Sequence, residues 1–257
     1  MLKVQEVSKV FIDGKKEFNA LNQVSFDVQA GEIFGFVGAN GAGKSTTMRI
    51  IMGVLAANAG EVYVDDVKVV GEHVNESAAA KARQTIGYMP SERGLYPKMQ
   101  VMEQLEFFGQ LKGLSAKEAH EQVEQLMTDL NVMAHKDKLL KDLSTGNAQR
   151  VQLVVALLGQ PKILILDEPF SGLDPIAVRH MSDSIKAMAQ KGVAVIFSSH
   201  QLELIDELCD RVGIINHGDM LHVGTPDELR AITHAQPTIT IPTPLANIFG
   251  DLMKGDA

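Results

Sequence analysis

Residues 33–46 read IFGFVGANGAGKST, and this stretch decides the fold. The apolar run Ile33–Val37 predicts a buried strand, because strands covered on both faces read as continuous apolar residues. A helical pattern of apolar residues begins at Lys44. The loop between them matches the pattern G-x-x-x-x-G-K-S/T, with Gly38 and Ser45 at its ends. Strand, glycine loop and helix in this order predict a phosphate-binding site.

Each residue type in the loop is suited to phosphate binding for a physical reason. Gly41 and Gly43 let the backbone curl so that several N–H groups point at a phosphate chain, and the helix N-terminus adds its positive dipole end. Lys44 is expected to reach the β- and γ-phosphates, and the Ser45 hydroxyl to hold Mg²⁺. The alternative is a turn that merely joins a strand to a helix, and the Lys-Ser pair argues against it. The residues expected to bind nucleotide here are Gly38, Asn40, Gly41, Gly43, Lys44, Ser45 and Thr46.

A second motif supplies carboxylates. Ile163–Leu166 is an apolar run that predicts another buried strand, and Asp167 and Glu168 follow it directly. We expect Asp167 to orient Mg²⁺ or its waters and Glu168 to polarise the attacking water as general base. An acid at a strand end is commonly just a polar terminus, but together with the phosphate loop the pair favours nucleotide hydrolysis.

The chain alternates strands and helices, with a helical insertion at about residues 98–158. This pattern predicts an α/β fold. In the insertion, Ser115 and Glu118 predict a capping box before a helix. The expected strands are 1–11, 19–28, 33–37, 60–70, 162–166 and 193–198, with a hairpin over 211–223 that turns at His217 and Gly218; the expected helices are 78–84, 101–111, 116–130, 175–190 and 201–209.

Composition narrows the class of protein. The 257 residues carry a formal net charge of −8, which argues against a nucleic-acid partner, since such proteins need a basic face. The single cysteine excludes an internal disulfide framework and fits a reducing compartment. The apolar runs fall short of the roughly 20 residues that span a bilayer, and the N-terminus lacks the apolar region of a signal peptide. We expect a soluble, cytoplasmic-type chain that reaches a membrane only through a partner.

Between the two halves of the site, residues 143–147 read LSTGN. This segment resembles the signature motif of ABC-type ATPases, usually LSGGQ. Residues 171–174, SGLD, resemble the D-loop of that family, and His200 matches its switch histidine. Phe11 occupies the place of the aromatic residue that stacks on adenine. The resemblance covers about residues 2–230, and five motifs follow in the family's order.

The resemblance implies a P-loop NTPase fold of ABC type: a mixed sheet core with an N-terminal antiparallel β-subdomain and an inserted α-helical subdomain. One ATPase domain is expected over residues 1–230, and residues 231–257 form a short extension of unassigned role. Two such domains, alike or different, would enclose two ATP molecules head to tail. Ser144 and Gly146 would then contact the γ-phosphate held by the partner, His200 the γ-phosphate of its own chain, and Asp174 would couple the two sites.

The resemblance further implies the ATP-hydrolysing subunit of a transporter, which binds peripherally on the cytoplasmic side to a separate membrane-spanning permease. Two positions depart from the family pattern. Ser91 stands where the family usually has a glutamine that contacts magnesium. Three alternatives follow: Ser91 contacts the ion directly, it contacts the ion through a water, or Glu92 takes over the role. The signature has Thr145 and Asn147 in place of glycine and glutamine. The stretch 91–97 together with LSTGN looks most like the export branch, which includes sodium-efflux and drug-export ATPases.

Two alternatives stay open at this stage. One is a soluble ABC-type protein that acts on ribosomes or DNA, against which the single domain and the acidic charge argue. The other is a nucleotide-dependent switch on a non-membrane partner, which the altered Ser91 would permit. Phe107, Phe108 and Leu111 fit either the face that docks a membrane subunit or internal packing of the helical insertion.

Overall fold

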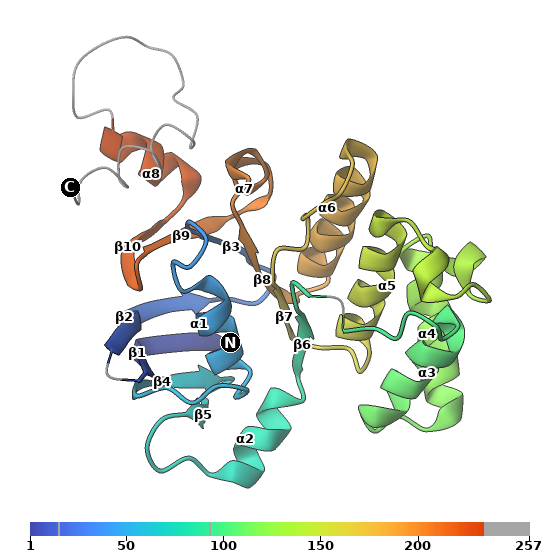
Figure 1. Ribbon diagram of the computed structural model, residues 1–257, viewed down its shortest axis with the longest axis horizontal. Coiled ribbons are helices and arrows are strands. Elements are labelled where there is room, and N and C mark those ends of the chain that lie inside the picture. The colour runs from blue at the N-terminus through green and yellow to red at the C-terminus, as the bar shows by residue number, and fades with distance from the viewer. Residues whose placement is uncertain (15, 93, 234–257) are drawn as a thin grey trace.

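The computed structural model describes residues 1–14, 16–92 and 94–233, and they build one ten-stranded mixed sheet with helices on both faces (Figure 1). The strand order is β5-β4-β1-β2-β10-β9-β3-β8-β7-β6. The expected α/β class is confirmed, and so is the division into a parallel core, an antiparallel N-terminal part and an inserted helical part.

Five strands form the parallel part of the sheet. Their bounds are β9 (Arg211–Asn216), β3 (Ile33–Val37), β8 (Ala194–Ser199), β7 (Ile163–Leu166) and β6 (Ile86–Met89). Within this group each pair of neighbours is parallel, and Leu166 lies opposite Phe197 in the register of β7 and β8. Because parallel strands end at the same edge, the loops after them meet there.

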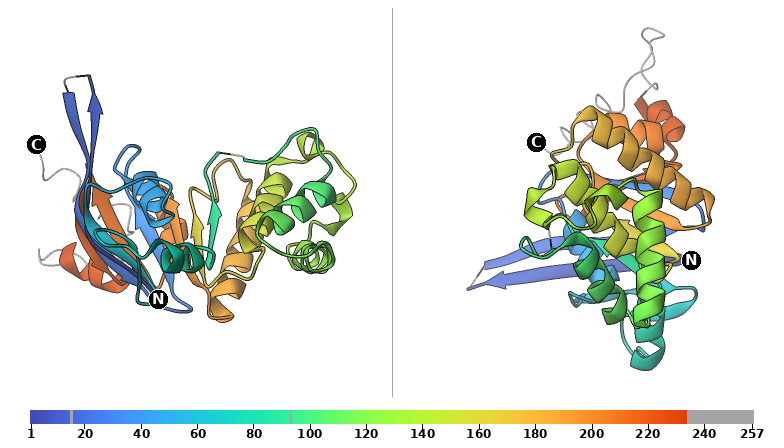
Figure 2. Two further views of the ribbon diagram at one scale, coloured as in Figure 1. Left: turned by 90° about the horizontal axis from the view of Figure 1, so that it is seen from below. Right: turned by 90° about the vertical axis from the view of Figure 1, so that its right-hand side faces the viewer.

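The other five strands are antiparallel apart from one bridge between β10 and β2. Their bounds are β5 (Val67–Val70), β4 (Ala59–Val64), β1 (Leu2–Asp13), β2 (Lys16–Val28) and β10 (Asp219–Gly224). β1 and β2 form a long hairpin whose tip projects beyond the rest of the molecule (Figure 2). β9 and β10 form the predicted hairpin, with His217 and Gly218 at the turn.

Helices cover the two faces of the sheet, and alternate residues of each central strand enter two cores. Phe34 and Phe36 of β3 pack on the side of α1 and α2, whereas Ile33 and Val37 pack on the opposite side. The second side is covered by α5 (Thr145–Leu157), α6, α7 and α8. The bounds are α1 (Lys44–Ile51), α2 (Glu76–Arg83), α6 (Pro175–Gln190), α7 (Leu202–Leu208) and α8 (Pro226–Thr233).

The inserted helices lie at the end of the molecule farthest from β1 and β2 (Figure 1). They are α3 (Val101–Leu111), α4 (Ala116–Asp129) and α5 (Thr145–Leu157), with short 3₁₀ turns at Met133–His135 and Leu140–Asp142. The predicted capping box at Ser115 and Glu118 is present. Phe108 packs against the core, as expected for internal packing of the insertion. Phe107 and Leu111 are exposed, as a docking face requires.

The helices include no candidate membrane span within the described residues, and they include one helix, α8, that was not expected. Among the described residues, no helix has both the length and the apolar character needed to cross a bilayer. α8 was not predicted, and it occupies the first residues of the expected extension 231–257, most of which lies outside the described residues.

Candidate active site

The loops that follow β3, β6, β7 and β8 meet at the carboxyl edge of the parallel strands. The loops after β3, β6 and β7, together with residues of the β1–β2 hairpin, line a pocket of about 390 Å³ there. Nine of the residues predicted from sequence line it: Phe11, Asn40, Gly41, Gly43, Lys44, Ser45, Thr46, Ser91 and Glu168. Ligands of open α/β sheets bind at this edge, in agreement with the predicted nucleotide site.

The glycines of the loop after β3 adopt conformations that other residues avoid. Gly41 and Gly43 have φ values of 82° and 113°, and a Cβ on Gly43 would lie 2.8 Å from the carbonyl oxygen of Ala20. Gly43 is the last residue before α1, so the free N–H groups of the first helical turn open onto the loop. This arrangement has the backbone form of an anion site.

The Lys44 ammonium lies inside the loop. Its Nζ donates to the carbonyl oxygens of Gly38 and Ala39, at 2.7 and 3.1 Å, and lies 3.7 Å from Glu168 Oε1. Burial lowers the pKa of Lys44, and the carboxylates of Glu168 and Asp167 oppose that shift. A buried cation with only one close carboxylate is placed to exchange that contact for a phosphate.

Glu168 joins Lys44 to His200. Its Oε2 lies 2.9 Å from His200 Nδ1, so that three residues predicted to act on the nucleotide, Lys44, Glu168 and His200, form one connected cluster. Glu168 has a φ of 52°, in the left-handed region that a non-glycine residue adopts at a cost. Its N–H donates to Ser198 Oγ at 2.8 Å, which holds this backbone turn.

Asp167 is fully buried and has one oxygen without a partner. Its Oδ1 accepts a hydrogen bond of 2.7 Å from Ser198 Oγ, whereas its Oδ2 makes none within the described part of the chain. A buried carboxylate oxygen without a partner is costly unless an ion or water completes it. Mg²⁺ is commonly held by one or two carboxylates together with substrate phosphates, so Asp167 and Ser45 fit this ion.

Sequence reasoning missed two residues of the site. Ser198 ends the expected strand 193–198, and a serine in that otherwise apolar strand, next to a strand that ends in an acid, is a usable signal. Phe18 lines the pocket with Phe11, its cross-strand partner in the β1–β2 hairpin. An aromatic residue on either side of the gap between the expected strands 1–11 and 19–28 is the signal that could have indicated it.

Six predicted residues do not line the pocket. Three of them adjoin it: Gly38 accepts from Lys44, Asp167 precedes Glu168, and His200 contacts Glu168.

The other three, Ser144, Gly146 and Asp174, lie at the starts of α5 and α6. Ser144 caps α5 and accepts the N–H of Asn147, and Asp174 caps α6 by accepting the N–H groups of Ile176 and Ala177. A Cβ on Gly146 would lie 2.8 Å from that of Ala177, so the starts of the two helices are packed together. Ser91 lines the pocket while Glu92 does not, which leaves Ser91 the nearer candidate for the missing glutamine.

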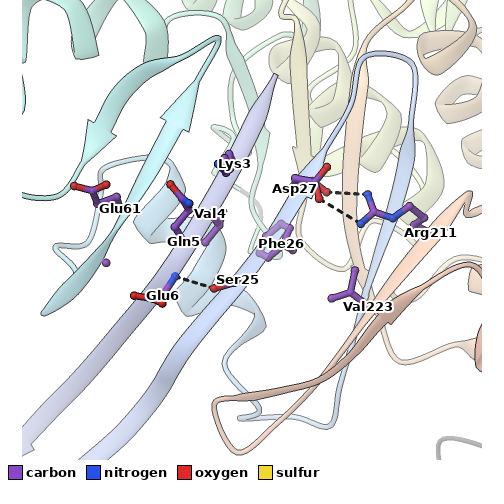
Figure 3. Close-up of a pocket in the computed structure, with 11 residues that line it drawn as sticks. Lys3, Val4, Gln5, Glu6, Ser25, Phe26, Asp27, Glu61, Arg211 and Val223 are labelled. Carbon is purple, nitrogen blue, oxygen red and sulfur yellow. Dashed lines mark hydrogen bonds and ion pairs between the residues drawn. The ribbon is translucent and has the colours of Figure 1, made fainter.

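A larger hollow of about 640 Å³ lies elsewhere, over β1, β2 and β4, and Figure 3 shows its lining. Asp27 and Arg211 face one another across one side, 3.3 Å apart. Glu61, on another side, is paired with Lys68 and Tyr63. None of the predicted site residues lines this hollow, and these charged groups are already partnered, so the smaller pocket is the candidate active site.

The sequence of residues 21–171, more than half of the chain, matches the family described as ABC transporter. The chain belongs to the ABC transporter family. It is 40% identical to an uncharacterized ABC transporter ATP-binding protein of Methanocaldococcus jannaschii, over 89% of this chain and 79% of that protein. It is 35% identical to the linearmycin resistance ATP-binding protein LnrL of Bacillus subtilis, over 89% of this chain and 70% of that one.

A solved structure described as the ATP-binding subunit of an ABC transporter superposes with a TM-score of 0.82. It covers 99% of this chain and all of its own, at 27% identity. These likenesses confirm the ABC-type fold expected from the motifs. The chain is an ATP-binding cassette protein of the ABC transporter family and an ATPase.

Proposed function

We propose that this chain is the motor subunit of a transporter, in which ATP hydrolysis drives a separate membrane-spanning permease. The observation that carries the proposal is the cluster of Lys44, Glu168 and His200 beside the buried, half-partnered carboxylate of Asp167. A phosphate loop, a general base and a metal carboxylate at one sheet edge are the parts that phosphoryl transfer to water requires.

The residues of the loop bind and orient the nucleotide. The N–H groups of residues 41–45 and the start of α1 receive the β- and γ-phosphates, and Lys44 exchanges its contact with Glu168 for them. Phe11 stacks on the adenine. Ser45 and Asp167 would hold Mg²⁺, with Ser91 near it, and the ion would neutralise charge on the phosphates.

Glu168 performs the proton transfer. Once Lys44 has moved to the phosphates, the carboxylate of Glu168 accepts a proton from the attacking water. At the same time the oxygen of that water bonds to the γ-phosphorus. The bond from that phosphorus to the bridging oxygen breaks, and ADP and phosphate result. His200, 2.9 Å from Glu168, orients the carboxylate and contacts the γ-phosphate.

The site in one chain is incomplete without a second copy or a related chain. Ser144 and Gly146 lie at the start of α5, outside the pocket that Lys44 and Ser45 line. In a head-to-tail dimer they would close the partner's pocket over the γ-phosphate, and Asp174 would lie between the two sites. Loss of the γ-phosphate removes this closing contact, so that hydrolysis reopens the dimer.

The direction we propose is export of an ion or small molecule, from the peripheral cytoplasmic side of the membrane. Its support is the similarity to a resistance protein together with the stretch at residues 91–97. The second candidate, a switch on a non-membrane partner, is favoured by Ser91, whose side chain is shorter than the glutamine it replaces.

The substitution Glu168→Gln tests the mechanism. The variant is expected to bind ATP and to accumulate as a dimer, with turnover lowered about 100-fold or more because the base is lost. Glu203→Gln, which changes an exposed carboxylate on α7, is the matched control and should keep wild-type turnover. Normal turnover in Glu168→Gln would exclude Glu168 as the base.

A second measurement separates the two candidate functions. ATPase activity is compared for the purified chain alone and after its addition to native membranes stripped of peripheral proteins. A motor subunit should bind to these membranes and change its turnover on binding. Failure to bind, with turnover unaffected, favours the soluble switch.

A further inference from the structure

Two buried glutamines of α5 connect the helix to both loops that carry the proposed chemistry. We infer that Gln149 and Gln152 are positioning residues that couple the loops after β6 and β7 to the N-terminus of the same helix. The inference rests on the proposed function, because it assigns the path by which one ATP site acts on the other.

Gln152 holds the loop that contains Ser91. The side chain is 4% exposed, and its Nε2 donates to the carbonyl oxygens of Pro90 and Glu92, at 2.8 and 3.3 Å. These two carbonyls lie on either side of Ser91, which lines the nucleotide pocket. Any displacement of Ser91 toward or away from a bound phosphate therefore moves the acceptors of Gln152.

Gln149 makes the equivalent contact with the second loop. It is 5% exposed, and its Nε2 donates at 3.2 Å to the carbonyl oxygen of Pro169, the residue that follows Glu168. The two glutamines are three positions apart and so lie on one face of α5. In each loop one acceptor is a proline carbonyl, and the proline ring restricts the φ of that residue, which limits how the loop can bend there.

The chemistry of Gln152 argues against a role in packing alone. Its neighbours Val151, Leu153 and Val154 are apolar and fully buried. Its own Oε1 is buried and accepts no hydrogen bond within the described residues. An amide with an unsatisfied oxygen is a costly choice for a core position. The cost of this unsatisfied oxygen is explained if the two hydrogen bonds that Gln152 donates to the Ser91 loop have a function.

The N-terminus of α5 indicates what this function is. The helix begins at Ser144 and Thr145, where the signature would contact ATP held by the partner chain. A helix transmits displacement as a rigid element, so a change at Pro90, Glu92 or Pro169 reaches Ser144 and Gly146. The two glutamines thus link the pocket of one chain to the ATP that the same chain closes in its partner.

The test uses Gln152→Met and Gln149→Met in the full chain. Methionine keeps the length and approximate volume of glutamine but has no N–H donor. We expect binding of a fluorescent ATP analogue to the monomer to change less than about twofold, because the phosphate loop is untouched. We expect kcat to fall about 10-fold and the Hill coefficient for ATP to fall toward about 1.

Gln104→Met is the matched control. Gln104 is a fully buried glutamine of α3. Its amide bonds to the later part of the segment after β6, to the carbonyls of Met99 and Gln100 and the N–H of Tyr96, rather than to Pro90, Glu92 or Pro169. It should lose comparable stability in a melting experiment while its Hill coefficient and kcat stay at wild-type values. Should Gln152→Met fail to fold, Gln152→Asn, whose amide has a shorter reach, is expected to show the same loss of cooperativity.

The outcomes separate this inference from the function on which it rests. If the wild-type chain hydrolyses ATP cooperatively and the glutamine variants keep its kcat and Hill coefficient, the coupling role is wrong and the proposed function stands. Equal losses in Gln104→Met would likewise overturn it in favour of general destabilisation. If the wild-type chain neither hydrolyses ATP nor dimerises with it, the proposed function itself fails.

Discussion

Ser198 on β8 donates a hydrogen bond of 2.7 Å to Asp167 Oδ1 at the end of β7. The same hydroxyl accepts the N–H of Glu168 at 2.8 Å. One side chain from the neighbouring strand therefore orients the proposed metal carboxylate and the backbone of the proposed base. Since Ser198 touches neither substrate nor the water in our proposal, it is a positioning residue, and its contribution is measurable through Asp167.

Ser198→Ala is predicted to weaken the Mg²⁺ dependence of the ATPase more than nucleotide binding. Without the hydroxyl, Asp167 Oδ1 loses its donor and the carboxylate can rotate away from the position in which Oδ2 faces the site. Loss of such an outer partner typically costs about 10- to 100-fold in metal affinity. Titration of Mg²⁺ at saturating ATP measures the shift in the concentration that gives half-maximal activity.

The control for this prediction is Ser184→Ala on α6, whose hydroxyl donates to the carbonyl oxygen of His180 on the same helix, away from Asp167. It should leave the Mg²⁺ titration unchanged. An unchanged titration in Ser198→Ala as well would mean that the fold holds Asp167 in place without the serine.

The phosphate loop and the acidic strand were predictable because their information is contiguous in the sequence. The phosphate loop is formed by neighbouring residues, among them Gly41, Gly43 and Lys44. Asp167 is recognisable because it comes directly after an apolar strand. The helices Val101–Leu111 and Pro175–Gln190 were predicted with their observed ends, since Asp174 and Pro175 mark a helix start locally.

The contacts that organise the site were not predictable in the same way. Ser198 bonds to Asp167 from the neighbouring strand, 31 positions along the chain, so the contact depends on which strands pair. Gln152 bonds to the carbonyl of Pro90, 62 positions away, and no side-chain pattern marks a backbone acceptor. α8 is a different case, because its signal was present: Thr225 and Glu228 form a capping box around Pro226. The preceding hairpin was recognised, and the helix start directly after it was overlooked.

Gly87→Ala is predicted to destabilise the whole domain. Gly87 lies in β6, where α5 passes so closely that a Cβ would lie 2.2 Å from the carbonyl oxygen of Ala156 and 3.0 Å from Pro161. A backbone oxygen cannot yield as a flexible side chain does, so strand and helix must separate, at a cost of about 1–3 kcal/mol or more. Urea unfolding should show a lower midpoint with an unchanged slope.

Gly94→Ala is the matched control, because among the described residues other than its chain neighbours no atom lies within 4 Å of the position that its Cβ would occupy. Its unfolding midpoint should stay within about 0.5 kcal/mol of the wild type. Equal midpoints for the two alanine variants would show that β6 and α5 can separate without loss of packing.

Cys209 is predicted to react slowly in the folded protein. Burial, together with the charge of Asp210, raises the pKa of its thiol well above the ordinary value. Because the thiolate is the nucleophile, alkylation at pH 8 should be about 100-fold slower in buffer than in guanidinium, and as the only cysteine it gives the whole signal.

The same shift sets a pH dependence of stability. A thiol that keeps its proton in the folded chain and loses it in the unfolded chain makes the free energy of unfolding fall as pH rises above about 8.5, the ordinary cysteine pKa. The wild type should therefore lose more stability than Cys209→Ser between pH 8 and about pH 10. Parallel losses in the two proteins, or rapid alkylation of the folded chain, would show that the thiol is accessible to water and ionises normally.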